Sequence, residues 1–192
     1  MIRDLLRKAS PAQIAQAKDM LAGSSHSAQR RVSFSGIALI GLRGAGKSTL
    51  GGELARRLGV PFFELDREIE AEAGTSLHEI FLLHGQAGFR RYERRTLERV
   101  LENNERCVIA TGGSLVTEPG TYDLLLSSCF VVWLSAKPEE HMGRVLAQGD
   151  LRPMAEGPQA MDDLKAILES RTALYAKADA KVERESREAS KR

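Results

Sequence analysis

The sequence predicts an α/β fold of three layers, in which helices cover both faces of a parallel β-sheet. Short, continuously apolar runs alternate along the chain with longer amphipathic runs, as expected when buried strands are joined by helices. The length of 192 residues accommodates one such domain and a short appendage. We therefore expect a helical extension and linker over residues 1–35 and the compact domain over residues 36–192.

The expected extension contains two short helices followed by a polar connection. The first helix is IRDLLRK, and the second is PAQIAQAKDMLA, which follows Ser10. Ser10 is a favourable N-cap, Pro11 suits the first helical position, and Gln13 completes a capping box. Residues 24–31 are rich in Ser and charged residues, which is typical of an exposed linker.

The compact domain is expected to alternate strands with helices. The apolar runs predict strands at residues 36–41, 61–66, 107–112, 129–135 and 180–183. The amphipathic runs predict helices at residues 47–58, 67–73, 76–83, 87–103, 119–127, 138–148 and 159–176. Ligands of such sheets bind beyond the carboxyl ends of the strands, so candidate functional residues are sought there.

Charge and hydropathy exclude several classes of partner. With 28 Lys and Arg against 26 Asp and Glu, the net charge of +2 gives no basis for non-specific nucleic-acid binding. No apolar run approaches the ~18–20 residues that cross a bilayer, and MIRDLLRKAS lacks the apolar region of a signal peptide. We expect a cytoplasmic protein without membrane or direct nucleic-acid partners. A monomer is expected, with a dimer as the alternative.

The cysteines and histidines indicate neither disulfides nor a zinc site. Cys107 and Cys129 each lie inside an apolar run, where thiols of a reducing compartment usually belong to the core. The four histidines are scattered, without a second ligand at the spacing that zinc sites need.

The strongest functional motif is a phosphate-binding loop, hereafter the phosphate loop, at residues 41–48. Its sequence GLRGAGKS fits G-x-x-x-x-G-K-[ST] and stands between a predicted strand and a predicted helix, as the motif requires. Lys47 is expected to reach the β- and γ-phosphates, and the Ser48 hydroxyl to ligate Mg²⁺. The expected nucleotide-binding residues are Gly41, Gly44, Ala45, Gly46, Lys47, Ser48 and Thr49. A nucleotide or another phosphate-bearing ligand is therefore expected.

Acidic residues at the end of the second predicted strand are candidates for the acceptor site. Glu64 and Asp66 are two residues apart, so their side chains would share one side of the strand. The alternative for Asp66 is an N-cap of the helix that begins at Arg67, a common role for aspartate.

Three further segments carry candidate residues. Arg90 belongs to FRRYERRTLER, most of whose arginines are expected on a solvated face paired with Glu93 and Glu98. Gly112 and Gly113 either allow the main chain to approach a ligand closely or form a plain turn.

Residues 149–158 are bounded by Gly and Pro, which favours a mobile lid that brings Arg152 over the transferred phosphate. The alternative is a surface loop with an incidental arginine. Arg171 lies on the helix after this segment, where it would be unremarkable alone.

Together these segments resemble the shikimate kinase family, small kinases of the nucleoside-monophosphate-kinase type, over residues 36–183. The matching segments are GLRGAGKST at 41–49, ELD at 64–66, Gly85 to Arg91, TGG at 111–113, LRP at 151–153 and Ser170 to Tyr175. The resemblance implies a P-loop NTPase fold and the ATP- and Mg²⁺-dependent phosphorylation of the 3-hydroxyl of shikimate.

The resemblance also implies roles for individual residues. Lys47, Asp66 and Arg152 would be catalytic, and Glu64 would contact the metal through a water. The substrate would be held by Asp66, Arg90, Gly112, Gly113 and Arg171. Residue chemistry agrees, because a guanidinium group binds a carboxylate bidentately and an aspartate can orient an attacking hydroxyl.

Several positions depart from the family pattern. Glu64 replaces the first acid of Asp-x-Asp, and Ser114 replaces the third glycine of the turn after the third strand. Arg144 is the nearest candidate for adenine stacking, residues 182–184 lack the usual aspartate, and RESREASKR lacks the usual closing helix. Weakened adenine binding is therefore expected.

Two alternatives remain open for the function. Residues 1–35 resemble the linker of bacterial regulators of aromatic degradation, in which a shikimate-kinase-like domain senses benzoyl-coenzyme A. In that case the phosphate loop would bind the phosphates of an aromatic coenzyme A ester. The extension is too short for a helix-turn-helix domain and lacks a basic recognition helix. Other small-molecule kinases of the same fold, such as sugar-acid kinases, form the second alternative.

Overall fold

The structure is a computed structural model that describes residues 36–147 and 159–183. The predicted extension, the whole predicted lid with Arg152, and the C-terminal residues from 184 lie outside the described residues. The side chains of residues 144–147 are likewise not described, so the expected adenine contact of Arg144 falls outside the description.

The centre of the fold is a parallel sheet of five strands in the order β2-β3-β1-β4-β5. All four neighbouring pairs are parallel, and the central β1 pairs Ile37 with Val108 of β3 and with Phe130 of β4. The strands are β1 Gly36–Ile40, β2 Phe62–Glu64, β3 Cys107–Ala110, β4 Cys129–Ser135 and β5 Ala180–Glu183.

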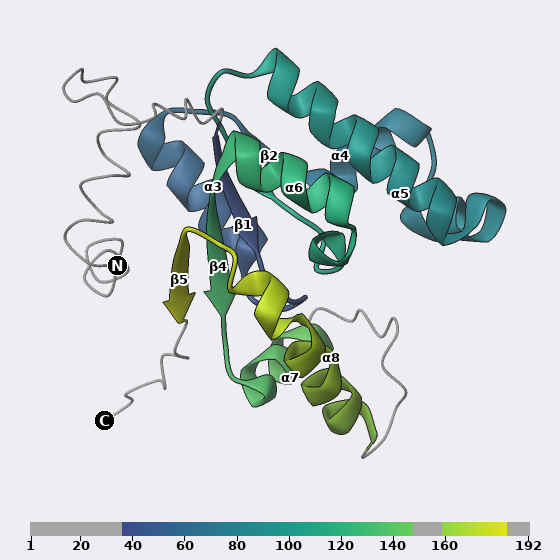
Figure 1. The fold of residues 1–192 in the computed structure, drawn as a ribbon, viewed down its shortest axis with the longest axis vertical. Coiled ribbons are helices and arrows are strands. Elements are labelled where there is room, and N and C mark those ends of the chain that lie inside the picture. Colours follow the sequence, from purple (N-terminus) through teal and green to yellow (C-terminus); the bar gives the residue numbers. More distant parts are fainter. Residues whose placement is uncertain (1–35, 148–158, 184–192) are drawn as a thin grey trace.

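Helices connect the strands and cover the sheet (Figure 1). They are α3 Lys47–Leu58, α4 Leu65–Ala73, α5 Leu77–Asn103, α6 Pro119–Ser128, α7 Pro138–Ala147 and α8 Gln159–Tyr175, with a 3₁₀ turn η1 at Leu115–Thr117. The two helices predicted at 76–83 and 87–103 are both present. They share the label α5 but are separated by a kink at Gly85, whose φ of 64° and ψ of −172° are not helical.

Successive residues of β1 contribute to cores on opposite faces of the sheet. Ile37 and Leu39 belong to a cluster with Ala55 of α3, whereas Ala38 and Ile40 belong to a cluster with Leu97 of α5. This alternation follows from the two-residue repeat of a strand. It confirms the predicted three-layer arrangement with a parallel sheet.

The end of β2 differs from the prediction. β2 ends at Glu64, α4 begins at Leu65, and Asp66 therefore lies in the first turn of that helix. The expectation that Glu64 and Asp66 share one side of a strand is wrong. The alternative role of Asp66 as N-cap is also wrong, because Glu64 occupies the N-cap position. The acids Asp66 and Glu68 in the first turn favour this early helix start through the helix dipole.

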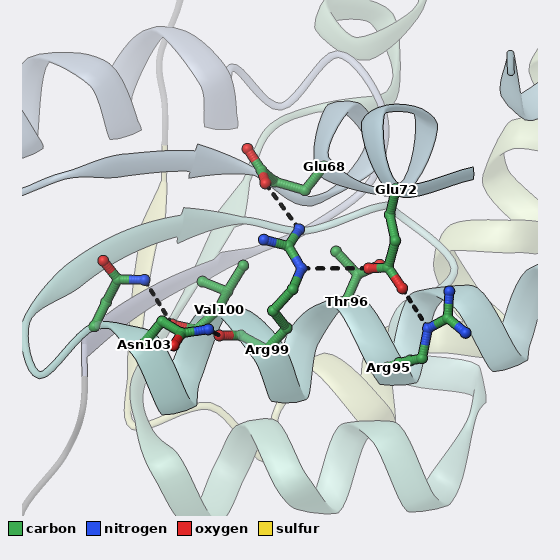
Figure 2. A network of polar contacts seen from close by, with 8 residues as sticks. Glu68, Glu72, Arg95, Thr96, Arg99, Val100 and Asn103 are labelled. Carbon is green, nitrogen blue, oxygen red and sulfur yellow. Dashed lines mark hydrogen bonds and ion pairs between the residues drawn. The ribbon is translucent and has the colours of Figure 1, made fainter. Parts of the chain in front are cut away.

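A network of charged side chains joins α4 to α5 (Figure 2). Glu72 accepts hydrogen bonds from Arg95 and, at 2.7 Å, from the hydroxyl of the buried Thr96. Arg99 donates to Glu72 at 3.4 Å and to Glu68 at 3.0 Å. The arginines of this run were expected to pair with Glu93 and Glu98 on their own helix. Arg95 and Arg99 instead bind glutamates of α4 and hold that helix against α5.

The cysteines agree with the prediction that they belong to the core, since Cys107 and Cys129 are both buried thiols. Among the described helices, none combines the length and the apolar character that would be required to cross a membrane.

We predict that Glu72→Ala lowers the free energy of unfolding by about 1–3 kcal/mol, because the buried Thr96 hydroxyl then loses its acceptor. The matched control is Glu98→Ala, which removes an exposed pair with Arg94 on α5 and costs about 0.5 kcal/mol or less. Urea denaturation of both variants measures the difference. Equal losses would show that the contact between α4 and α5 does not depend on Glu72.

Candidate active site

The phosphate loop connects the end of β1 directly to the first turn of α3. Gly44 and Gly46 have φ values of 77° and 86°, a left-handed conformation that residues with a side chain rarely adopt. Gly46 is also the N-cap of α3, so the positive end of the helix dipole faces the loop. The chain thus has the strand, loop and helix that the motif requires.

The ammonium group of Lys47 lies inside this loop. It donates to the main-chain oxygens of Gly41 at 2.8 Å and of Leu42 at 3.1 Å. Burial lowers the pKa of Lys47 to about 8, although the nearby carboxylate of Asp66 opposes this shift. Arg43 lowers the pKa further. The lysine is therefore held at the phosphate loop, close to both charged neighbours.

The main chain after β3, residues 111–114, hereafter the glycine turn, packs against the phosphate loop. A Cβ added at Gly113 would lie 3.3 Å from the main-chain nitrogen of Arg43 and 3.5 Å from the oxygen of Gly41. A Cβ at Gly112 would lie 2.9 Å from the carboxylate of Asp66. The ends of three strands therefore meet at one place, and glycines permit the close approach.

Asp66 lies between the phosphate loop and the glycine turn. Burial raises the pKa of its carboxyl group, while the charges of Lys47 and Arg43 act in the opposite direction. Glu64, expected to reach a metal through a water, is paired at 2.6 Å with Arg67. Of the two acids, only Asp66 is thus shown in contact with the glycine turn.

Arg90 and Glu93 form an ion pair of 2.6 Å next to the glycine turn. Arg90 also donates to the main-chain oxygen of Ser114 at 3.3 Å and to the hydroxyl of Thr117 at 3.0 Å. Glu93 is fully buried, and one of its oxygens has no hydrogen-bond partner among the described residues. Burial raises the pKa of Glu93 to about 7, against the effect of Arg90. The expectation that Glu93 lies on a solvated helix face is therefore wrong.

The helix α8 reaches the same turn with two donors. Arg171 donates to the main-chain oxygen of Gly113 at 3.0 Å, and the hydroxyl of Tyr175 donates to that oxygen at 2.9 Å. Tyr175 is fully buried and stacks on Trp133 of β4, with ring centroids 5.5 Å apart. Arg90 and Arg171, predicted separately, are thus bonded to carbonyl groups of consecutive residues.

Tyr175 and Glu93 were not assigned to the site from the sequence. Tyr175 follows Arg171 by four residues, a spacing that places both on one helix face and could have identified it. Ser48 and Thr49 lie exposed in the first turn of α3. In the strand β5, Glu183 is paired with Lys181 at 2.9 Å.

The arrangement brings three chemical functions together. The phosphate loop offers main-chain N–H groups, a lysine and a helix N-terminus to phosphate oxygens. Asp66 offers a carboxylate to a hydroxyl, and Arg90 and Arg171 offer guanidinium groups to an anion. Such a site can position a phosphate donor against a small acidic acceptor.

Comparisons with known proteins agree with this chemistry. The model of the family described as Shikimate kinase matches residues 43–192. A shikimate kinase of Symbiobacterium thermophilum is 41% identical over 143 residues, covering 74% of this chain and 82% of the relative. One from a Synechococcus species is 37% identical over 163 residues, covering 85% and 81% respectively.

Solved structures agree as well. Shikimate kinase from Acinetobacter baumannii in complex with shikimate superposes with a TM-score of 0.72 at 31% identity, covering 80% of this chain and 86% of that one. The enzyme from Bacteroides thetaiotaomicron has a TM-score of 0.69 at 34% identity, covering 76% and 83%. Because the family match spans most of the sequence and several relatives exceed 30% identity over most of their length, this chain belongs to the shikimate kinase family.

Proposed function

We propose that this chain transfers the γ-phosphoryl group of ATP to the 3-hydroxyl of shikimate. The observation that carries the proposal is the contact between the phosphate loop and the glycine turn, with Asp66, Arg90 and Arg171 gathered around it. Membership in the shikimate kinase family favours this phosphotransferase activity over an effector-sensing domain.

On the donor side, the phosphate loop would hold the β- and γ-phosphates. Lys47 would exchange the oxygens of Gly41 and Leu42 for phosphate oxygens, which a flexible ammonium group can do without moving the main chain. Ser48, which is exposed in the first turn of α3 beside the loop, would offer its hydroxyl as a ligand of Mg²⁺. When bound, Mg²⁺ would neutralise charge on the phosphates. Glu64 would contact it through a water only after leaving Arg67.

On the acceptor side, Asp66 would accept a hydrogen bond from the attacking hydroxyl and orient it toward the phosphate. Arg90 and Arg171 would bind the carboxylate of shikimate, because guanidinium groups pair with carboxylates in a planar, bidentate geometry. Gly112 and Gly113 would line the ring. Phosphoryl transfer depends mainly on such positioning and on electrostatics. Arg152 lies outside the described residues, and its catalytic role stays a prediction.

The proposal includes a reducing, cytoplasmic setting, in which buried thiols such as those of Cys107 and Cys129 usually belong to the core. It is tested by a coupled assay of ADP release with and without shikimate. Release that requires shikimate supports the kinase. Absence of turnover, together with calorimetric binding of benzoyl-coenzyme A, would replace it with the effector-sensing function. Turnover with a sugar acid alone would indicate another kinase of the same fold.

We predict that Asp66→Asn lowers kcat by about 10²–10³-fold and leaves the affinity for an ATP analogue nearly unchanged, because the amide cannot accept the hydroxyl proton. The matched control is Glu68→Gln on the same helix, whose side chain pairs with Arg99 at 3.0 Å and which is expected to leave kcat at the wild-type value. Steady-state kinetics and calorimetry measure the two quantities. Equal losses of kcat and nucleotide affinity would assign Asp66 a structural role.

We predict that, compared with Glu93→Gln, the wild type loses free energy of unfolding as pH rises from about 4.5 to about 7. In this window the raised pKa of Glu93 makes the folded state bind more protons than the unfolded state. The full difference is on the order of 3 kcal/mol, at about 1.4 kcal/mol per pKa unit. Urea denaturation across this range measures it, with Glu98→Gln as the control. Parallel curves for Glu93→Gln and wild type would contradict a buried, titrating Glu93.

A further inference from the structure

One more side chain from a distant segment contacts the phosphate loop. His141 lies in the first turn of α7 and is only 1% exposed. Its Nδ1 atom lies 3.0 Å from the main-chain oxygen of Arg43, although the two residues are 98 positions apart in the sequence. A carbonyl oxygen can only accept a hydrogen bond, so Nδ1 carries the proton and donates it.

This bond fixes the orientation of one peptide group of the loop. The carbonyl group of Arg43 and the N–H group of Gly44 belong to the same planar trans peptide bond, so they point in opposite directions. While His141 holds the carbonyl, the N–H group of Gly44 must point away from α7. Main-chain N–H groups are the phosphate ligands of such loops, so the orientation of this peptide matters for binding.

The neighbouring carbonyl groups depend on a different donor. Lys47 donates to the oxygens of Gly41 and Leu42, and the latter also accepts from the main-chain nitrogen of Ala45. When Lys47 turns to phosphate oxygens, it leaves both carbonyl groups. His141 does not have to move in that exchange, because it bonds the loop from the side of α7.

We propose that His141 is a positioning residue that holds the Arg43–Gly44 peptide of the phosphate loop in the orientation that binds the nucleotide. The inference rests on the proposed function in taking ATP as the ligand. It predicts an effect on nucleotide affinity that loss of packing alone would not produce.

The experiment compares full-length variants at position 141. His141→Phe keeps an aromatic ring but has no donor, and we expect it to raise the Kd of a non-hydrolysable ATP analogue roughly tenfold, given the cost of losing a hydrogen bond to a partly buried carbonyl group. His141→Asn restores a donor near the position of Nδ1, and its Kd is expected within about twofold of wild type. The KM for shikimate is expected to stay unchanged in both variants. His141→Leu serves if the phenylalanine variant fails to fold.

The control is Thr96→Val, which removes another buried side-chain hydrogen bond, at the contact between α4 and α5. It is expected to lower the melting temperature without changing the Kd of the analogue. A Kd of His141→Phe within twofold of wild type, or a Kd of His141→Asn as high as that of His141→Phe, would overturn the inference. Absence of shikimate-dependent turnover in the wild type would refute the proposed function, whereas the Kd comparison would still decide the role of His141.

Discussion

The site depends on the close approach of two main-chain segments, which is possible because Gly113 has no side chain at the point of contact. The glycine turn lies against the phosphate loop so tightly that a single added Cβ at Gly113 would come within 3.3 Å of Arg43. Because β1 and β3 are hydrogen-bonded neighbours in the sheet, this contact is set by the register of the sheet itself. In the proposed mechanism, this contact fixes the distance between the phosphate loop, which would hold the phosphate donor, and the residues that would hold the acceptor.

Burial acts on the charged groups of the site in opposite directions. It raises the pKa of Asp66 and of Glu93 and lowers that of Lys47, since in each case the charged form loses water. An opposite charge partly counteracts each pKa shift: Asp66 acts on Lys47, and Arg90 acts on Glu93. The charges therefore stabilise one another across elements, and the removal of one leaves another buried without its counterion.

Local patterns predicted the phosphate loop and the layers of the fold, because a loop motif and hydrophobic periodicity are visible within a few residues. The position of Asp66 was predicted less well, because the early start of α4 depends on a very short β2. The burial of Glu93 was visible in principle, since it stands on the same helix face as Phe89 and Leu97. The contacts of Tyr175 and His141 join segments 62 and 98 residues apart, which no local pattern indicates.

The carbonyl groups of the glycine turn have a consequence for which molecules this protein accepts. Arg90 and Arg171 already donate to Ser114 and Gly113, so the acceptor that we propose for these arginines would compete with existing hydrogen bonds. A neutral molecule would replace one hydrogen bond from a guanidinium group to an uncharged oxygen by another and gain little. A carboxylate brings a negative charge and a bidentate geometry, so the exchange with the carbonyl groups favours it. In the proposed site, uncharged analogues would therefore be disfavoured because these internal hydrogen bonds compete with them, independently of their shape.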